Sequence, residues 1–214
     1  MNEDDVATYL RLNPQFFDQH PELLEKIHVP HPYGGRAIPL AERQTVALRE
    51  KAKLLEGKLG ELIQFGEEND VISEKVHRLA VAIAGARDFP ALAQSLYFHL
   101  REDFAVPHVA LRVWGKSVPV DFDEAAAVGE AERRQAATMA VPQCGPAAGS
   151  GFAAWFGEAA EHMRSLALVP LGQTAVFGLL LLGSEDPERF YPEMGTLYLR
   201  RIGELCAAGV TARL

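Results

Sequence analysis

Apolar residues recur at seven-residue spacing between about Pro39 and about Gly85, and this repeat constrains the fold more than any other feature. One series consists of Leu48, Leu55, Leu62, Asn69, Val76 and Ile83, and its companion series of Thr45, Ala52, Leu59, Gly66, Ser73 and Ala80. A sustained heptad repeat predicts one continuous helix with a coiled-coil seam along its first half. At 1.5 Å per residue the helix is on the order of 65–70 Å long, which is longer than a small domain is wide.

The second half of this predicted helix has a different pattern. Gly66 and Ser73 interrupt the seam, and a wider apolar stripe appears near the end. The stripe consists of Ile72, Val76, Leu79 and Ile83. A wide stripe is typical of a helix that packs on a domain, so we expect the start of the helix to pair with another helix and its end to dock on the C-terminal region. The predicted dimer interface consists of Leu48, Leu55, Leu59, Leu62 and Asn69, where Asn69 either fixes the register or is simply an exposed polar residue.

The long helix separates two regions of different character. Before it, residues 1–36 predict a small helical region, in which Val6, Tyr9 and Leu10 have helical spacing and Pro21 suits the first position of a helix. This region ends in a turn-rich segment, Val29 to Gly35. The sequence therefore predicts three parts: residues 1–36, a helical dimerisation segment at 37–86, and a C-terminal domain at 87–214.

Helical and strand patterns alternate in the C-terminal part. The expected helices are Asp88 to Asp103, Glu124 to Met139, Phe152 to Gly157 and Pro192 to Ala212, and the expected strands are Val106 to Trp114, Val118 to Phe122, Leu166 to Leu171 and Val176 to Leu182, with a loop at Ala140 to Gly151. The last two strands form a hairpin, which excludes an all-parallel sheet. The fold class is α+β, an antiparallel sheet with helices on its faces.

Charge and cysteine content narrow the class of protein. The net charge of −8 argues against a nonspecific nucleic-acid surface. The longest apolar run, Val176 to Gly183, is too short to span a bilayer, and the acidic N-terminus lacks the pattern of a signal peptide. Two cysteines make no disulfide framework. We therefore expect a soluble, cytoplasmic protein that binds neither nucleic acid nor membrane.

The end of the chain resembles a GAF domain, a small-molecule sensing fold related to PAS domains. The residues that carry the resemblance are Val169-Pro170-Leu171, Phe177-Gly178-Leu179, the Gly183-Ser184 edge and Phe190. The whole chain is similar to a bacterial family, the domain-of-unknown-function family four-eight-four. Its marks are NPQFFDQHPELL (13–24), VPH (29–31), ERQ with a following LR (42–44 and 48–49) and GSEDPERFYPEMGTLYL (183–199). The resemblance implies a GAF/PAS-like sheet with a ligand pocket on one face.

Two segments supply candidate pocket residues. In the strand His108 to Trp114, side chains alternate, so Arg112 and Trp114 face away from the set that packs on helices and suit an anionic or planar ligand. The loop Gln143 to Phe156 adds glycine-rich backbone before a helix start, where an anion is favoured. Its candidates are Gln143, Cys144, Ser150, Gly151 and Trp155. The alternatives are a solvated arginine, a partly buried tryptophan and an ordinary flexible loop.

Catalytic and metal chemistry lack complete sets of residues. Free methionine sulfoxide reductases of the GAF type use several pocket cysteines, but here only Cys144 is near, and Cys206 is expected as small core filler. His20, His28 and His31 lie within a dozen residues, but no Cys or acidic ligand completes a metal set nearby. We therefore expect no catalytic residues, no metal and no cofactor.

Three functions remain open, in this order. The first is a regulatory module that binds an unidentified small molecule and signals through a dimeric helix to an unknown effector protein. The second is a non-catalytic interaction scaffold whose pocket is filled by its own side chains. The third is an enzyme of the sulfoxide-reductase type.

Overall fold

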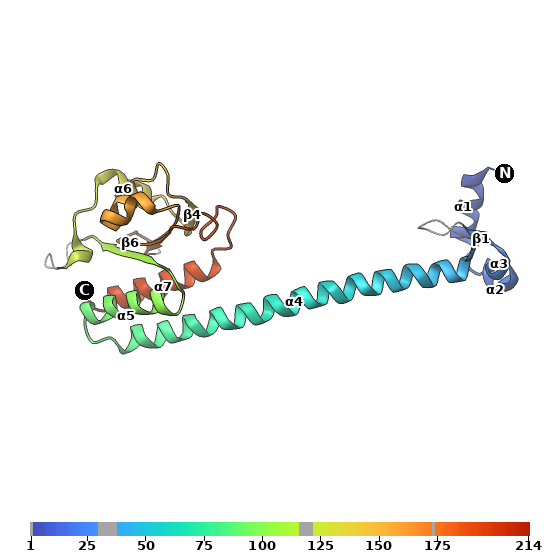
Figure 1. Ribbon diagram of the computed structural model, residues 1–214, viewed down its shortest axis with the longest axis horizontal. Coiled ribbons are helices and arrows are strands. Elements are labelled where there is room, and N and C mark those ends of the chain that lie inside the picture. The colour runs from blue at the N-terminus through green and yellow to red at the C-terminus, as the bar shows by residue number, and fades with distance from the viewer. Residues whose placement is uncertain (1, 30–37, 116–121, 173) are drawn as a thin grey trace. The chain divides into compact units, whose positions relative to one another are not determined.

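The computed structural model describes residues 2–29, 38–115, 122–172 and 174–214. They form two compact units, Met1–Glu67 and Glu68–Leu214, and the boundary lies inside the long helix α4 (Leu40–Gly85) (Figure 1). This helix has 46 residues, as the heptad repeat predicts. No helix in the described part of the chain has both the length and the hydropathy that crossing a bilayer requires.

The N-terminal unit consists of short helices and a two-stranded sheet before α4. Its elements are α1 (Glu3–Leu12), α2 (Phe16–Gln19), α3 (Pro21–Lys26), β1 (His28–Val29) and β2 (Ile38–Pro39). Helix α1 begins with a capping box, in which the Asn2 side chain accepts from the Asp5 amide and the Asp5 carboxylate accepts from the Asn2 amide, both at 2.8 Å. The antiparallel pairing of β1 with β2 has no local sequence signal, and the predicted turn after Val29 lies outside the described residues.

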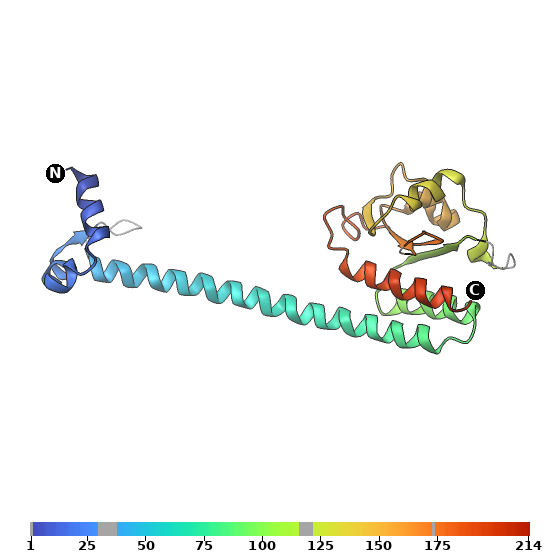
Figure 2. The ribbon, with the colours of Figure 1, turned by 180° about the vertical axis from the view of Figure 1, so that it is seen from behind.

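The C-terminal unit is an antiparallel sheet between two layers of helices, and the predicted α+β class is confirmed. Figures 1 and 2 show, from opposite sides, the end of α4 together with α5 and α7 on one face of the sheet, and α6 on the other. Strands β3 and β4 form the two edges, because the strand order is β3-β6-β5-β4. The elements are α5 (Phe89–Glu102), β3 (His108–Val113), η1 (Asp123–Ala125), α6 (Glu130–Ala137), β4 (Gln143–Pro146), η2 (Gly151–His162), β5 (Ser165–Leu171), β6 (Gly178–Ser184) and α7 (Leu197–Thr211).

A separate hydrophobic core lies on each face of this sheet. The core under α4, α5 and α7 includes Leu79, Leu92, Leu96, Leu111, Leu180 and Ile202. The core under α6 and η2 includes Ala136, Met139, Phe152, Met163, Leu179 and Leu181. All seven residues of β6 are buried, which is the pattern of a central strand covered on both faces and agrees with the apolar run that predicts it.

Some predicted elements differ from the observed ones. The expected helix Glu124 to Met139 is divided into η1 and the shorter α6. The backbone leaves the helical conformation at Ala126, after η1, and becomes helical again only after Gly129, the N-cap of α6. The expected loop Ala140 to Gly151 contains strand β4. Helix α7 begins at Leu197 rather than at Pro192, and the predicted strand Val118 to Phe122 lies outside the described residues except for its last position.

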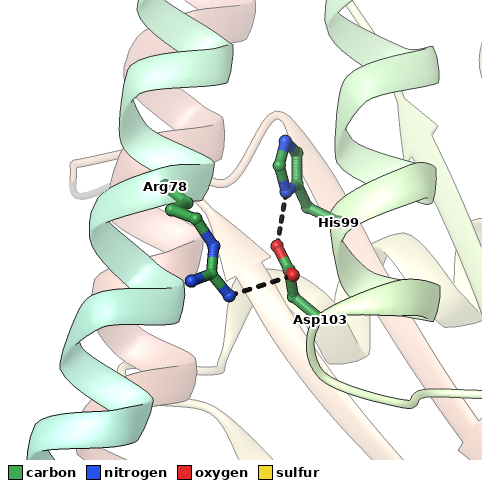
Figure 3. A network of polar contacts seen from close by, with 3 residues as sticks. All are labelled: Arg78, His99 and Asp103. Atoms are coloured by element: carbon green, nitrogen blue, oxygen red, sulfur yellow. Dashed lines mark hydrogen bonds and ion pairs between the residues drawn. The ribbon is translucent and has the colours of Figure 1, made fainter.

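Apolar and polar contacts fix the end of α4 to the rest of the C-terminal unit, as the wide stripe predicts. Leu79 and Ile83 are buried in the core. In Figure 3, Arg78 reaches from α4 toward the end of α5, where its Nη2 lies 3.0 Å from Oδ1 of Asp103. Nδ1 of His99 lies 2.6 Å from the other carboxylate oxygen. The hydrogen bond from His99, together with Arg78, holds the pKa of Asp103 below its ordinary value, so the carboxylate is charged in this network.

Candidate functional site

Arg112 and Trp114 lie at the edge strand β3, on the predicted side. Val109, Leu111 and Val113 pack into the core of α5 and α7, so the alternation of the strand turns Arg112 and Trp114 to the other face. Both side chains are half-buried and already engaged. The Arg112 guanidinium donates to the Leu111 carbonyl at 3.0 Å and lies 5.8 Å from the centre of the Trp155 ring. Trp114 donates from Nε1 to the Val176 carbonyl at 3.2 Å.

A half-buried phenol and a carboxylate form a hydrogen bond close to the β3 edge of the sheet. The Tyr97 hydroxyl donates to Oε1 of Glu124 at 2.9 Å, and this bond joins α5 to η1. Burial, followed by the nearby charge of Glu124, raises the pKa of Tyr97 far above its ordinary value. Tyr97 therefore keeps its proton and acts as a hydrogen-bond donor at the sheet edge, not as a base.

The start of η2 holds Ser150 and Gly151. Ser150 is the N-cap residue of η2, but its side chain makes no capping hydrogen bond within the described residues. The carboxylate of Glu132 lies near, since its Oε1 would be 3.9 Å from a Cβ added at Gly151. A negative side chain therefore already lies near the position predicted for an anion. Further along η2, Trp155 packs edge-on against Phe152 with ring centres 5.4 Å apart.

Gln143 and Cys144 lie on β4, at the opposite edge of the sheet from Arg112. Three strand spacings separate the two edges, on the order of 14 Å. Gln143 is exposed, whereas Cys144 packs against the core of α4, α5 and α7. Cys144 and Arg112 are thus on opposite faces. The structure brings together Arg112 and Trp155, and it does not bring Cys144 to them.

The face predicted to line a pocket is filled by its own side chains. Phe152, Leu166, Leu179 and Leu181 are each no more than 1% exposed. Met139 and Met163 complete this layer, with Trp114, Trp155 and Phe156 packed at its margin. Between α6, η2 and the sheet, the described side chains therefore form a second packed core.

An open cleft lies elsewhere in the C-terminal unit, with a volume of about 1210 Å³. Its walls are the end of β5, the described residues between β5 and β6, the end of α6 with the residues after it, and one side of α7. Small residues line the α7 wall: Gly203, Ala207, Ala208 and Thr211. None of the seven predicted ligand residues, all of which the structure describes, lines this cleft. The sequence signal available for it was the near-four-residue spacing of small residues along α7.

The two cysteines are free thiols in protected surroundings. Burial raises the pKa of Cys144 above its ordinary value and raises the pKa of Cys206 to about 12. A thiol acts as a nucleophile only when it is deprotonated, so neither position activates its sulfur. Cys206 lies in the core, as expected for small core filler.

The N-terminal histidines do not gather around a common point in the described residues. Nδ1 of His20 lies 3.6 Å from Oε1 of Glu22, and Nδ1 of His28 lies 2.8 Å from the Lys26 carbonyl. His31 lies outside the described residues. Among those that are described, no three His, Cys, Asp or Glu side chains are placed to hold a metal ion.

The segment from Ser184 to Phe190, which belongs to the last family mark in the sequence, has a structural role. The Ser184 hydroxyl accepts from the Asp186 amide at 3.1 Å, and the Asp186 carboxylate accepts from the Glu188 amide at 2.9 Å, so these two side chains form a turn directly after the strand. Ser165 donates to the Asp186 carbonyl at 2.6 Å, and Phe190 is buried. These residues close the exit of the chain from the sheet.

Comparisons with known proteins support a family assignment. The chain is 24% identical to the uncharacterized protein YigA of Salmonella typhimurium over 209 residues, which cover 94% of this chain and 88% of that protein. The YigA proteins of Shigella flexneri and Escherichia coli match over the same shares at 25% and 24% identity. Among solved structures, the GAF domain of A. Aeolicus nlh2 in an inactive state is similar to 68% of this chain and 99% of that chain, with a TM-score of 0.49 and 17% identity. The family model described as "Protein of unknown function, DUF484" matches residues 1–211, which confirms the resemblance carried by the sequence marks, and the chain belongs to that family.

Proposed function

We propose that this protein is a non-catalytic, cytoplasmic regulatory module that works as a homodimer joined through α4 and passes its state to an effector protein. The observation that carries the proposal is the exposed leucine seam of α4. Leu48, Leu55, Leu59 and Leu62 are each 58–66% exposed in the single chain. Leucines at heptad spacing are the pattern that a second helix covers in a coiled coil, and a second copy of α4 has the matching pattern.

The apolar area of this seam favours the pairing of two α4 helices. Burying one leucine side chain fully contributes about 1.5–3 kcal/mol, so a side chain that is roughly 60% exposed gains on the order of 1–2 kcal/mol. Four such positions on each of two chains contribute on the order of 8–16 kcal/mol before the entropy cost of association. Association itself costs roughly 4–15 kcal/mol. A micromolar dissociation constant corresponds to about 8 kcal/mol of net binding energy, so it requires a contribution from the upper part of this range.

Contacts inside the C-terminal unit supply a route from the domain to α4. Besides Arg78, the backbone of Asn69 accepts from the Tyr198 hydroxyl at 3.1 Å, which connects α7 to α4. Arg213 binds the last carbonyls of α4 from the other end of α7. A change in the packing of α5 or α7 would therefore alter the contacts that hold α4, and this is the step we assign to signalling.

Sedimentation velocity on a matched pair of variants tests the proposal. Leu54 and Leu55 are neighbours on α4 with similar exposure, 65% and 59%, but only Leu55 lies in the seam. We expect Leu55→Asp to weaken dimerisation by about a hundredfold or more, because two charges enter the seam, and Leu54→Asp to leave it almost unchanged. Equal effects of the two variants, or a wild type that is monomeric at micromolar concentration, would remove the α4 dimer.

The cleft beside α7 supports small-molecule binding as a second candidate. A volume of about 1210 Å³ admits a metabolite, and Arg200 and Glu204 supply polar groups at its wall. Ala208 is exposed there, so Ala208→Trp fills the cleft without disturbing the core. If a small molecule that raises the melting temperature of the wild type raises that of Ala208→Trp equally, the cleft is not its site.

The non-catalytic part of the proposal is supported by the placement of Cys144. Its thiol has a raised pKa and packs against the core, away from Arg112 and Trp155. A free methionine sulfoxide reductase assay on the wild type and on Cys144→Ser tests this point. Turnover by the wild type that is lost in the variant would establish an enzyme instead.

A further inference from the structure

The N-terminal unit contains an apolar groove whose lining residues belong neither to the C-terminal unit nor to the leucine seam of α4. Its lining comes from α1, α2 and the residue after α3: Asp5, Val6, Tyr9, Leu10, Phe16, Phe17 and Ile27. The groove has a volume of about 560 Å³, and Asp5 is the single charged residue among the described residues that line it. A groove of this size and composition suits two or three large apolar side chains of a partner.

The helices around the groove do not bury their own apolar residues. No side chain of α1 or α2, all of whose residues the structure describes, is buried. Tyr9 is 54% exposed and Leu12 is 75% exposed. The aromatic rings of Tyr9 and Phe16 meet edge-on with centres 6.0 Å apart, and Phe16 meets Phe17 in the same way at 5.4 Å. Clustered, rigid aromatic side chains at a surface are typical of the central residues of a protein interface.

The part of the chain that forms the groove is acidic. Residues 1–28 carry six carboxylates, Glu3, Asp4, Asp5, Asp18, Glu22 and Glu25, against two basic side chains, Arg11 and Lys26. Three of the acids occupy the first turn of α1, beside the groove residue Val6. An apolar centre with a negative rim is complementary to an apolar stripe flanked by lysine and arginine.

We propose that this groove is the effector site of the protein, and that it binds a basic amphipathic helix of a partner protein. The inference rests on the proposed output to an effector and names its chemistry: apolar side chains at i, i+3 or i+4, and i+7, with basic residues on both sides. Helix-in-groove recognition fits, because the lining side chains are mostly apolar and an amphipathic helix lays its apolar face into such a groove. If a second copy of this region occupied the groove, two acidic surfaces would face each other. An anionic membrane would likewise repel the acidic residues around the groove. Like-charge repulsion therefore disfavours these two occupants.

The test uses the full chain, immobilised, and two helical peptide libraries. Both libraries place Leu, Ile, Phe or Met at i, i+3, i+4 and i+7; one fills the remaining positions with Lys and the other with Glu. We expect enrichment from the lysine library, with binding that weakens as salt rises because the rim charges are screened. The best peptide is then measured against variants by fluorescence anisotropy.

Matched variants distinguish binding in the groove from nonspecific binding elsewhere on the protein. Tyr9→Ser removes an exposed groove residue and is expected to weaken binding about tenfold or more, whereas Tyr191→Ser, at a tyrosine 43% exposed in the C-terminal unit, leaves it unchanged. The double substitution Glu3→Gln with Asp4→Asn is expected to weaken binding and to reduce its salt dependence. Its control is Glu188→Gln with Glu193→Gln, two exposed acids of the C-terminal unit.

Each outcome decides the inference. Enrichment from neither library, preference for the glutamate library, or equal loss in Tyr9→Ser and Tyr191→Ser would overturn it. Binding of the wild type to anionic lipid vesicles that is lost in Tyr9→Ser would also overturn it, in favour of a membrane. The sedimentation experiment is independent: a dimer that binds no peptide retracts only this inference, and a monomer that binds the lysine peptide retracts only the α4 dimer.

Discussion

Replacing Arg213 tests how the domain holds the end of α4. The Arg213 guanidinium lies beside the carbonyls at the end of α4 and just after it: Nη2 is 2.7 Å from the carbonyls of Ile83 and Ala86, and Nε is 3.0 Å from Ala86. Nη1 also donates to the Gly209 carbonyl of α7 at 2.9 Å. The last carbonyls of a helix lack partners within the helix, so Arg213 both satisfies them and places a positive charge at the negative end of the dipole.

The expected loss in Arg213→Ala follows from these contacts. A hydrogen bond to a charged donor contributes about 1.5–3 kcal/mol, and the bonds made by one guanidinium do not add in full. Arg213 is half-buried, so water replaces part of what the substitution removes. We expect the free energy of unfolding of the C-terminal unit to fall by about 2–3 kcal/mol and its melting temperature by about 5–10 °C. Arg213→Lys should lose about half as much, because an ammonium reaches fewer of these carbonyls.

Urea unfolding followed by tryptophan fluorescence measures this loss. The chain has two tryptophans, Trp114 and Trp155, and both lie in the C-terminal unit, so the signal reports on that unit alone. The control is Arg200→Ala, which removes an exposed α7 arginine whose Nε lies 4.0 Å from Glu204. If Arg213→Ala is within about 0.5 kcal/mol of Arg200→Ala, the guanidinium does not anchor α4 and the argument fails.

Three further substitutions or reagents test other parts of the structure. Asp103→Asn should lower the free energy of unfolding by up to about 1 kcal/mol at neutral pH. Because folding lowers the pKa of Asp103, this loss should be complete above about pH 4 and should vanish as the pH falls through the pKa of the folded state. Urea titrations at several pH values would measure it. Iodoacetamide should alkylate Cys144 slowly, and the rate should increase only as the pH rises above the ordinary range of thiol pKa values. Cys206 should remain unmodified until the protein unfolds. Rapid labelling of Cys144 at neutral pH would contradict its raised pKa. A Cβ added at Gly209 would lie 2.6–2.7 Å from side chains of α4 and α5, so Gly209→Ala should destabilise the C-terminal unit by about 1–3 kcal/mol. Gly60 lies on the open surface of α4, so Gly60→Ala should instead raise the helicity measured by circular dichroism. An unchanged stability in Gly209→Ala would show that the packing around Gly209 can relax.

Features with a local cause could be predicted from the sequence. The α5 helix begins where Asp88 caps it, with its side chain accepting from the Ala91 amide at 2.9 Å, and Pro90 occupies a first-turn position. The apolar stripe at the end of α4 identifies Leu79 and Ile83 as core residues. In each case the residues of a single element determine its position or its buried face, through a helix cap or through the spacing of its apolar residues.

Features that depend on distant partners could not be predicted. Strand β4 lies in a segment rich in proline and glycine, and only its pairing with β5, as in Cys144 opposite Ala167, makes it a strand. Alternation within β3 places Arg112 on one face, but it does not say that β3 and β4 are opposite edges of the sheet. The alternation of β3 therefore predicts the shared face of Arg112 and Trp114, whereas the separation of Cys144 from them and the cleft beside α7 depend on the tertiary arrangement.

Native mass spectrometry of the purified wild type tests the central claim most directly, because it reports the mass of the assembly and of any molecule retained with it. The account predicts a species of twice the chain mass of 23.4 kDa that Leu55→Asp converts to single chains and Leu54→Asp does not. A wild type that gives only the single-chain mass under gentle conditions at micromolar concentration would contradict the claim that α4 joins two copies.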